Sequence, residues 1–102
     1  QVYTHNGTRA TGHDPVAWAQ QMEACGAGEL LITAIEHDGL MQGYDLALTR
    51  AIAAAVSIPV VAAGGAGRLS DLKAAVNEGY ASAVAAGSLF VYHGPRKAVL
   101  VN

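Results

Sequence analysis

Residues 58–72 read IPVVAAGGAGRLSDL, and this stretch predicts a strand, a glycine turn and the start of a helix in immediate succession. Pro59 suits the first position of a strand, and the run Val60–Ala63 has no polar residue, as expected of a parallel strand covered on both faces. The glycines within residues 64–67 let the backbone adopt positive φ angles and bring N–H groups close to a ligand, with no Cβ in the way. Ser70 is then expected to cap the helix.

The glycine turn is suited to binding an anion. Oriented N–H groups beside a helix N-terminus favour negative charge, and phosphate is the common biological case. A tight turn that binds nothing would use the same glycines, and short glycine motifs occur in many unrelated chains. The glycines alone therefore leave both interpretations open.

Length and composition limit the architecture. The chain has 102 residues, which we take as one domain over residues 1–102, whereas a complete α/β barrel needs roughly 200 or more. Apolar residues make up 52% of the chain and charged residues 14%, although about a quarter charged is typical of globular domains. We therefore expect other protein to cover much of the surface.

Charge and cysteine content exclude several classes of protein. The net charge is −2, and Arg96-Lys97 is the largest basic cluster, so nucleic acid is not an expected partner. The single cysteine, Cys25, excludes an internal disulfide and a cysteine-based metal site. It is expected to be a small buried apolar group in a reducing cytoplasm. No apolar stretch approaches 18 residues, so we expect neither a signal peptide nor a membrane span.

Strands and helices are predicted to alternate along the chain. Alternation at steps of roughly 20 to 30 residues predicts right-handed crossovers and parallel strands. Asp14 and Asp45 are expected N-caps, Gly26 is expected to end a helix, and Gly79 is the expected left-handed stop. The expected strands are residues 1–4 at an edge, 29–35, 58–63 and 81–86, and residues 98–101 begin a further element. The residues expected to face inward from the helices are Trp18, Met22, Cys25, Leu48, Ile52, Val56, Leu72, Ala75 and Val76.

Polar and glycine residues follow each internal strand at its carboxyl end. They occupy residues 33–39, 64–67 and 87–88. In parallel α/β sheets these ends lie at one edge, and ligands bind there. Three loops are therefore expected to converge on one site.

Five motifs in register point to a family. They are residues 4–12 (THNGTRATG), 26–29 (GAGE), 38–45 with Asp38-Gly39 and Gly43-Tyr44-Asp45, 64–67 (GGAG) and 85–88 (AAGS). Together they resemble the C-terminal half of the cyclase subunit of imidazole glycerol phosphate synthase, a (βα)8 barrel of histidine biosynthesis. Residues 87–102 more closely resemble the cyclase-like branch associated with glycosyl amidation in lipopolysaccharide sugar synthesis, and the choice between the two stays open. The aldose-ketose isomerase of the same pathway shares the Asp-Gly loop, but residues 43–45 and 64–67 favour the cyclase.

The resemblance implies a fold and a set of site residues. The fold is α/β, a partial (βα)8 TIM barrel with about three parallel strands and their helices, roughly the C-terminal half. The phosphate-binding positions implied are Gly64, Gly65, Gly87 and Ser88, with Thr33 and Gly39 in the substrate-binding set. Asp38 is the candidate for acid/base catalysis, although an Asp-Gly turn that only closes the loop explains it equally well.

The resemblance also implies substrates and partners. The parent barrel takes ammonia from a glutaminase partner and uses it on a phosphorylated sugar-derived substrate, with no cofactor and no metal. The family usually has serine at the position of Ala63 and threonine at that of Leu40, so the substrate of this chain is open. The catalytic aspartates of the family lie on strands upstream of Gln1, so we expect no turnover by this chain alone. Self-association into a homo-oligomer is expected, and a non-catalytic phosphate-binding half-barrel is the alternative to an enzyme.

The four histidines are not expected to bind metal. They lack helical i, i+4 spacing and matched carboxylates, so loop or surface positions are expected. They are His5, His13, His37 and His93.

Overall fold

The computed structural model describes residues 1–93, 96 and 98–99. The strands are β1 (Tyr3–Thr4), β2 (Arg9–Ala10), β3 (Leu30–Thr33), β4 (Val60–Ala63), β5 (Ala83–Val84), β6 (Tyr92–His93) and β7 (Ala98–Val99). The helices are α1 (Pro15–Ala24), α2 (Leu46–Ala55), α3 (Leu69–Asn77) and α4 (Ser88–Val91). Of the element expected over residues 98–101, residues 100–101 lie outside the described part of the chain.

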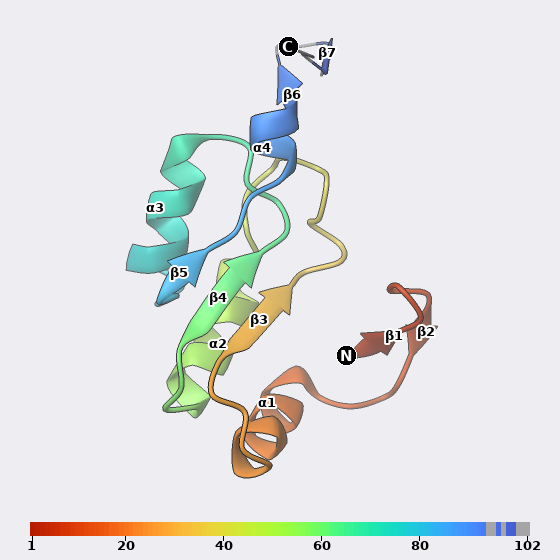
Figure 1. Ribbon diagram of the computed structural model, residues 1–102, viewed down its shortest axis with the longest axis vertical. Helices are drawn as coiled ribbons and strands as arrows, with labels where there is room; N and C mark the ends of the chain where they lie inside the picture. The colour runs from red at the N-terminus through yellow and green to blue at the C-terminus, as the bar shows by residue number, and fades with distance from the viewer. Residues whose placement is uncertain (94–95, 97, 100–102) are drawn as a thin grey trace.

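A parallel sheet of order β3-β4-β5 forms the centre of the molecule (Figure 1). Leu30 lies opposite Val60, and Val61 lies opposite Ala83. The predicted alternation of parallel strands and helices is therefore confirmed. The strand expected over residues 81–86 is shorter than predicted, because only Ala83–Val84 pair with β4.

The N-terminal strand does not join this sheet. β1 instead pairs antiparallel with β2, with Tyr3 opposite Ala10. This hairpin packs on the loop after β3, since a Cβ built on Gly7 would lie 3.4 Å from Ile35 Cγ2. The predicted edge strand is therefore one half of a separate hairpin.

Two of the predicted helix caps are confirmed. The Asp14 carboxylate accepts a hydrogen bond from Ala17 N (3.0 Å), and the Asp45 carboxylate accepts one from Leu48 N (3.0 Å). Gly26 follows the end of α1 with φ +103°, as expected of a helix stop.

The predicted caps of α3 are wrong at both ends. Ser70 lies inside the first turn, because the helix already begins at Leu69. Asp71 caps this end instead, since its carboxylate accepts hydrogen bonds from Gly67 N (2.9 Å) and Arg68 N (3.1 Å). At the other end, Tyr80 rather than Gly79 takes the left-handed conformation, with φ +58°.

Gly79 has a different structural reason to be glycine. A Cβ built on it would lie 2.7 Å from the Ala75 carbonyl oxygen, so close packing excludes a larger residue. The Arg50 guanidinium stacks on the ring of Tyr80, 4.7 Å from its centroid. Tyr80 therefore gains a contact at the position where the chain turns.

Two buried clusters form the core. One contains Ala19, Ile52 and Val60, from α1, α2 and β4. The other consists mainly of alanines, with Tyr44 as its one large member; its residues are Tyr44, Ala62, Ala66, Ala75 and Ala81. The inward positions predicted for Leu48, Ile52, Val56, Leu72 and Ala75 are confirmed by their membership of these clusters or their packing against them.

Two residues predicted to be buried are exposed. Val76 is 45% exposed, because it lies one position beyond Ala75 and so about 100° around the helix from the buried face. Cys25 is an exposed free thiol, because it lies after the last residue of α1.

The helices cover only one face of the parallel sheet. Leu30, Ile32 and Val60 pack into the cluster beneath α1 and α2. On the other face, Leu31 is 63% exposed, and Thr33 and Ala83 are exposed as well. The expectation of cover on both faces is therefore wrong within the described residues. In that part of the chain, no helix has the length and apolar character needed to cross a membrane.

Candidate functional site

Three loops meet at the carboxyl edge of the parallel sheet, as the sequence predicts. Figure 1 shows β3, β4 and β5 pointing in one direction, toward the end of the molecule that holds α4. The loops are residues 34–45 after β3, 64–68 after β4 and 85–87 after β5. This edge holds most of the candidate site residues.

The turn after β4 has the predicted conformation. Gly64 and Gly65 have φ +89° and +117°, which favour glycine, and both residues are buried. A Cβ built on Gly64 would lie 2.9 Å from the Ala34 carbonyl oxygen, and one on Gly65 would overlap the Gly43 carbonyl oxygen. The glycines are therefore required by the loop that packs on them, a reason that the sequence pattern does not reveal.

Hydrogen bonds attach this loop to the turn. Gly43 N donates to the Gly65 carbonyl oxygen (2.7 Å), and Ala34 N donates to the Ala63 carbonyl oxygen (3.2 Å). Among the described residues, the N–H groups of Gly64 and Gly65 donate no hydrogen bond to another protein group. The turn thus uses a carbonyl to hold the neighbouring loop and leaves two N–H groups without a protein acceptor.

The turn after β5 is more open. Gly87 is exposed, with φ −118°, and a Cβ built on it would meet no atom within 4 Å. Ser88 is the first residue of α4 and is half-buried. Leu89 of the same helix packs against the cluster that contains Ala66. α4 and the glycine turn therefore contribute residues to the same packed cluster.

Asp38 and Gly39 lie in the turn that follows β3. Asp38 N donates to the Ala34 carbonyl oxygen (2.9 Å), and Gly39 has φ +80°. Asp38 Cβ lies 3.4 Å from the position that a Cβ of Gly64 would occupy, so the exposed Asp38 side chain starts beside the glycine turn. Asp38 therefore lies in the turn that closes this loop, through its backbone N–H.

Thr33 lies on the uncovered face of the sheet. It is the last residue of β3, it is exposed, and it pairs with Ala63. Thr33 also lines a groove of about 400 Å³ between the N-terminal hairpin, Pro15 and the start of α2. Neither glycine of the turn lines this groove, so the groove and the glycine turn are separate features.

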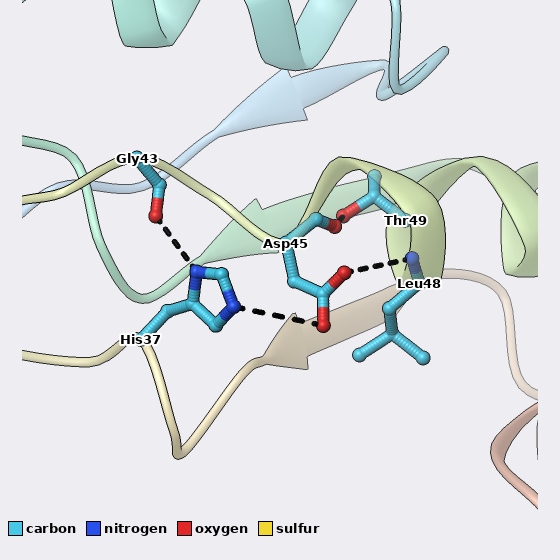
Figure 2. Close-up of polar contacts among 5 residues, drawn as sticks. All are labelled: His37, Gly43, Asp45, Leu48 and Thr49. Carbon is cyan, nitrogen blue, oxygen red and sulfur yellow. Dashed lines mark hydrogen bonds and ion pairs between the residues drawn. The ribbon is translucent and has the colours of Figure 1, made fainter.

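A histidine-aspartate contact joins the loop after β3 to α2 (Figure 2). His37 Nδ1 lies 3.0 Å from the Gly43 carbonyl oxygen, and His37 Nε2 lies 3.9 Å from Asp45 Oδ2. Thr49 Oγ1 donates to the Asp45 carbonyl oxygen (2.9 Å). The expectation that the histidines lack a matched carboxylate is therefore wrong for His37. Sequence reasoning identified Asp45 as a cap and as part of a family motif but not as the partner of His37, because the spacing of residues 37 and 45 matches no helix or strand period.

Tyr44 connects the loop after β3 to the end of β5. The residue is buried, and its hydroxyl donates to the Ala85 carbonyl oxygen (2.8 Å). Burial, and secondarily the Asp71 carboxylate, raises the pKa of the Tyr44 hydroxyl above its ordinary value. The hydroxyl therefore keeps its proton, and this hydrogen bond, in neutral solution.

The described residues hold no group of three histidine, cysteine, aspartate or glutamate side chains arranged to bind a metal ion. His5 and His13 are exposed, and the His13 ring lies 4.9 Å from that of Trp18. Trp18 is half-buried and lines a second groove, beside β3.

The fold and the three loops define an α/β fragment with parallel strands, consistent with part of a TIM barrel. The sequence profile of the family described as histidine biosynthesis protein matches residues 1–95. This chain therefore belongs to the histidine biosynthesis protein family.

Proposed function

We propose that this chain is the phosphate-binding half of a cyclase of this family, corresponding to the C-terminal half of the cyclase subunit of imidazole glycerol phosphate synthase. The observation that carries the proposal is the glycine turn after β4. The N–H groups of Gly64 and Gly65 have no protein acceptor among the described residues, and Leu89 of α4 packs against the cluster that contains Ala66. Backbone N–H groups in such a turn favour a dianion.

Each candidate residue has a role in this proposal. The N–H groups of Gly64, Gly65 and Ser88, with the Ser88 hydroxyl, hold one phosphate of a sugar-derived substrate. Gly87 leaves space for the phosphate to approach, because no atom lies within 4 Å of its Cβ position. In the substrate-binding set, Gly39 shapes the loop and Thr33 offers a hydroxyl. Asp38 moves a proton as ammonia from a glutaminase partner adds to the substrate and the ring closes.

Binding of inorganic phosphate tests this proposal directly. We expect the amide signals of Gly65 and Ser88 to shift in heteronuclear NMR spectra as phosphate is added. Chloride at equal ionic strength is the control, and Ser88→Ala is expected to weaken phosphate binding. Shifts confined to residues distant from the carboxyl edge would contradict the proposal.

A second candidate is a cyclase-like protein of glycosyl amidation, or a binding half-barrel without catalysis. Ala63, at the end of β4, and Leu40, which is 49% exposed, bring no hydroxyl to the loops around the turn. This favours a substrate other than the nucleotide of the histidine pathway. Measuring the affinities of a plain sugar phosphate and of a nucleotide that carries the same phosphate separates these candidates from a histidine-pathway cyclase. Only a histidine-pathway site is expected to bind the nucleotide more tightly, because only such a site contacts the base.

We further propose that the chain forms a homo-oligomer and acts in the cytoplasm. The uncovered sheet face, with Leu31 63% exposed, favours self-association. The exposed thiol of Cys25 suits a reducing compartment. Light scattering coupled to size-exclusion chromatography tests the association, and a single monomeric species would contradict it.

A further inference from the structure

His37 lies beside the glycine turn of the proposed phosphate site. Its Nδ1 lies 3.0 Å from the Gly43 carbonyl oxygen. Its Cβ lies 3.1 Å from the position that a Cβ of Gly65 would occupy. The same side chain therefore contacts both the loop after β3 and the glycine turn on which that loop packs.

The chemistry of these contacts determines which nitrogens carry protons. The Gly43 carbonyl can only accept, so Nδ1 must carry the hydrogen. Asp45 accepts from Leu48 N (3.0 Å) at Oδ1, and its Oδ2 faces His37 Nε2 at 3.9 Å (Figure 2). A neutral ring with its proton on Nδ1 turns a lone pair toward this carboxylate, whereas an imidazolium turns an N–H toward it.

Gly43 connects the His37 ring to the glycine turn, because it forms hydrogen bonds with both. Its carbonyl is held by His37, and its N–H donates to the Gly65 carbonyl oxygen (2.7 Å). We propose that His37 is a positioning residue. Its ring holds the Gly43 carbonyl, and Gly43 N in turn holds the carbonyl of the Gly65–Ala66 peptide, which fixes the turn directly after the Gly65 N–H of the proposed phosphate site. The imidazolium form, which also attracts Asp45, holds the ring more firmly than the neutral form does. This inference rests on the proposed phosphate site.

Carboxylates on three segments lie near the ring. Asp45 faces it from the start of α2, Asp71 of α3 lies beside Gly43, and Glu36 and Asp38 adjoin it in the loop. Carboxylates ordinarily titrate about two pH units below imidazoles. A pH dependence of binding is therefore attributed to this ring only where it is lost in a variant without the histidine.

The test compares binding of inorganic sulfate and phosphate to the wild-type chain between pH 5.5 and 8. Sulfate stays a dianion over this range, so its affinity reports the protein alone. We expect wild-type affinity for sulfate to fall by up to about fivefold as the pH rises, the size expected for loss of the ion pair with Asp45, because the neutral ring keeps its hydrogen bond to the Gly43 carbonyl. His37→Ala is expected to bind about fivefold more weakly at the low pH and to lose the pH dependence.

His37→Asn is the variant that isolates the hydrogen bond from the charge. Its side-chain N–H can replace Nδ1 as donor to the Gly43 carbonyl, so its affinity is expected to exceed that of His37→Ala and to be independent of pH. His13→Ala removes an exposed histidine and is expected to retain the wild-type profile. Equal affinities and equal pH profiles for the wild type and His37→Ala would overturn the positioning role.

A measurement without ligand separates this inference from the proposed function. The amide signals of Gly43 and Gly65 are expected to move with the titration of the His37 ring, and to stay fixed in His37→Asn. Anion-induced shifts missing at Gly65 and Ser88 would refute the phosphate site alone. Signals at Gly43 and Gly65 that ignore the titration of His37 would refute the positioning role, whether or not anions bind.

Discussion

The two turns at the carboxyl edge of the sheet both contain glycine, but they differ in the structural reason for it. At the turn after β4, side chains larger than hydrogen are excluded by neighbouring backbone, and Gly65 is buried with φ +117°. At the turn after β5, Gly87 is exposed, has a negative φ and has no atom within 4 Å of its Cβ position. The fold therefore requires glycine at the first turn and permits any small residue at the second.

This difference separates structural from functional reasons for a glycine. The first turn would keep its glycines even if it bound nothing, because residues 34–45 pack on it. Folding alone does not explain the glycine of the second turn, and the proposed phosphate site would explain it by the close approach of a ligand. Variants at the two turns should consequently affect different quantities.

Gly65→Ala is expected to have the largest effect on stability. The new methyl group would overlap the Gly43 carbonyl and lie in a strained backbone conformation. We expect the free energy of unfolding to fall by about 3 kcal/mol or more, measured by urea denaturation. Gly28→Ala is the matched control, because a Cβ on Gly28 meets nothing within 4 Å. Equal free energies of unfolding for Gly65→Ala and Gly28→Ala would show that the fold does not require glycine at the turn after β4.

Asp71→Ala is expected to have the next largest effect. Asp71 holds Gly67 N and Arg68 N, and no equivalent carboxylate caps the turn after β5 in the described residues. Loss of both hydrogen bonds should lower the free energy of unfolding by about 2 kcal/mol. Ser70→Ala, on the adjacent residue, should change it by less than about 0.5 kcal/mol. The reverse order in denaturation experiments would restore Ser70 as the cap.

Tyr44→Phe removes the link between the loop after β3 and the end of β5. We expect a loss of about 1 kcal/mol at neutral pH, since the Ala85 carbonyl loses its donor. The raised pKa of Tyr44 means that the folded state holds this proton more tightly than the unfolded state. Its stabilising effect is complete below the unfolded pKa and is lost as the pH rises through the folded pKa.

Unfolding followed from pH 8 to 11 measures this dependence. The difference in stability between wild type and Tyr44→Phe should shrink as the solution becomes alkaline. A constant difference over this range would show that ionisation of Tyr44 does not contribute.

Gly87→Ala is expected to have the smallest effect on stability. The methyl group meets no neighbour, so the free energy of unfolding should change by less than about 0.5 kcal/mol. Phosphate affinity, followed through the amide signal of Ser88, should nevertheless fall about fivefold. Unchanged affinity together with unchanged stability would leave Gly87 without a role in the site.

Local sequence signals predicted the framework well. Asp14 and Asp45 cap the helices that follow them, and Val60–Ala63 form the central strand, because these signals act over a few residues. Ser70 and Asp71 both suit a cap, and the choice depends on where the N–H groups of residues 67 and 68 point. That direction is set by packing of the turn against residues 34–45, which no local pattern contains.

The candidate site was predictable in location but only partly in detail. Apolar strands ending in glycine or polar residues indicated one edge of the sheet, and the three loops meet there. The contact between His37 and Asp45 was not predictable, because it depends on how the loop between them folds back. The packing of that loop on Gly65 was not predictable for the same reason.

The alanine-rich cluster beneath the glycine turn has a mechanical consequence. Ala62, Ala66, Ala75 and Ala81 have no side-chain torsion with alternative rotamers, so this support cannot rearrange by rotamer exchange. Heating should therefore leave the turn in one arrangement until the surrounding backbone itself opens. Below that point, rotamer changes of these four residues do not alter the spacing of the amides in the turn.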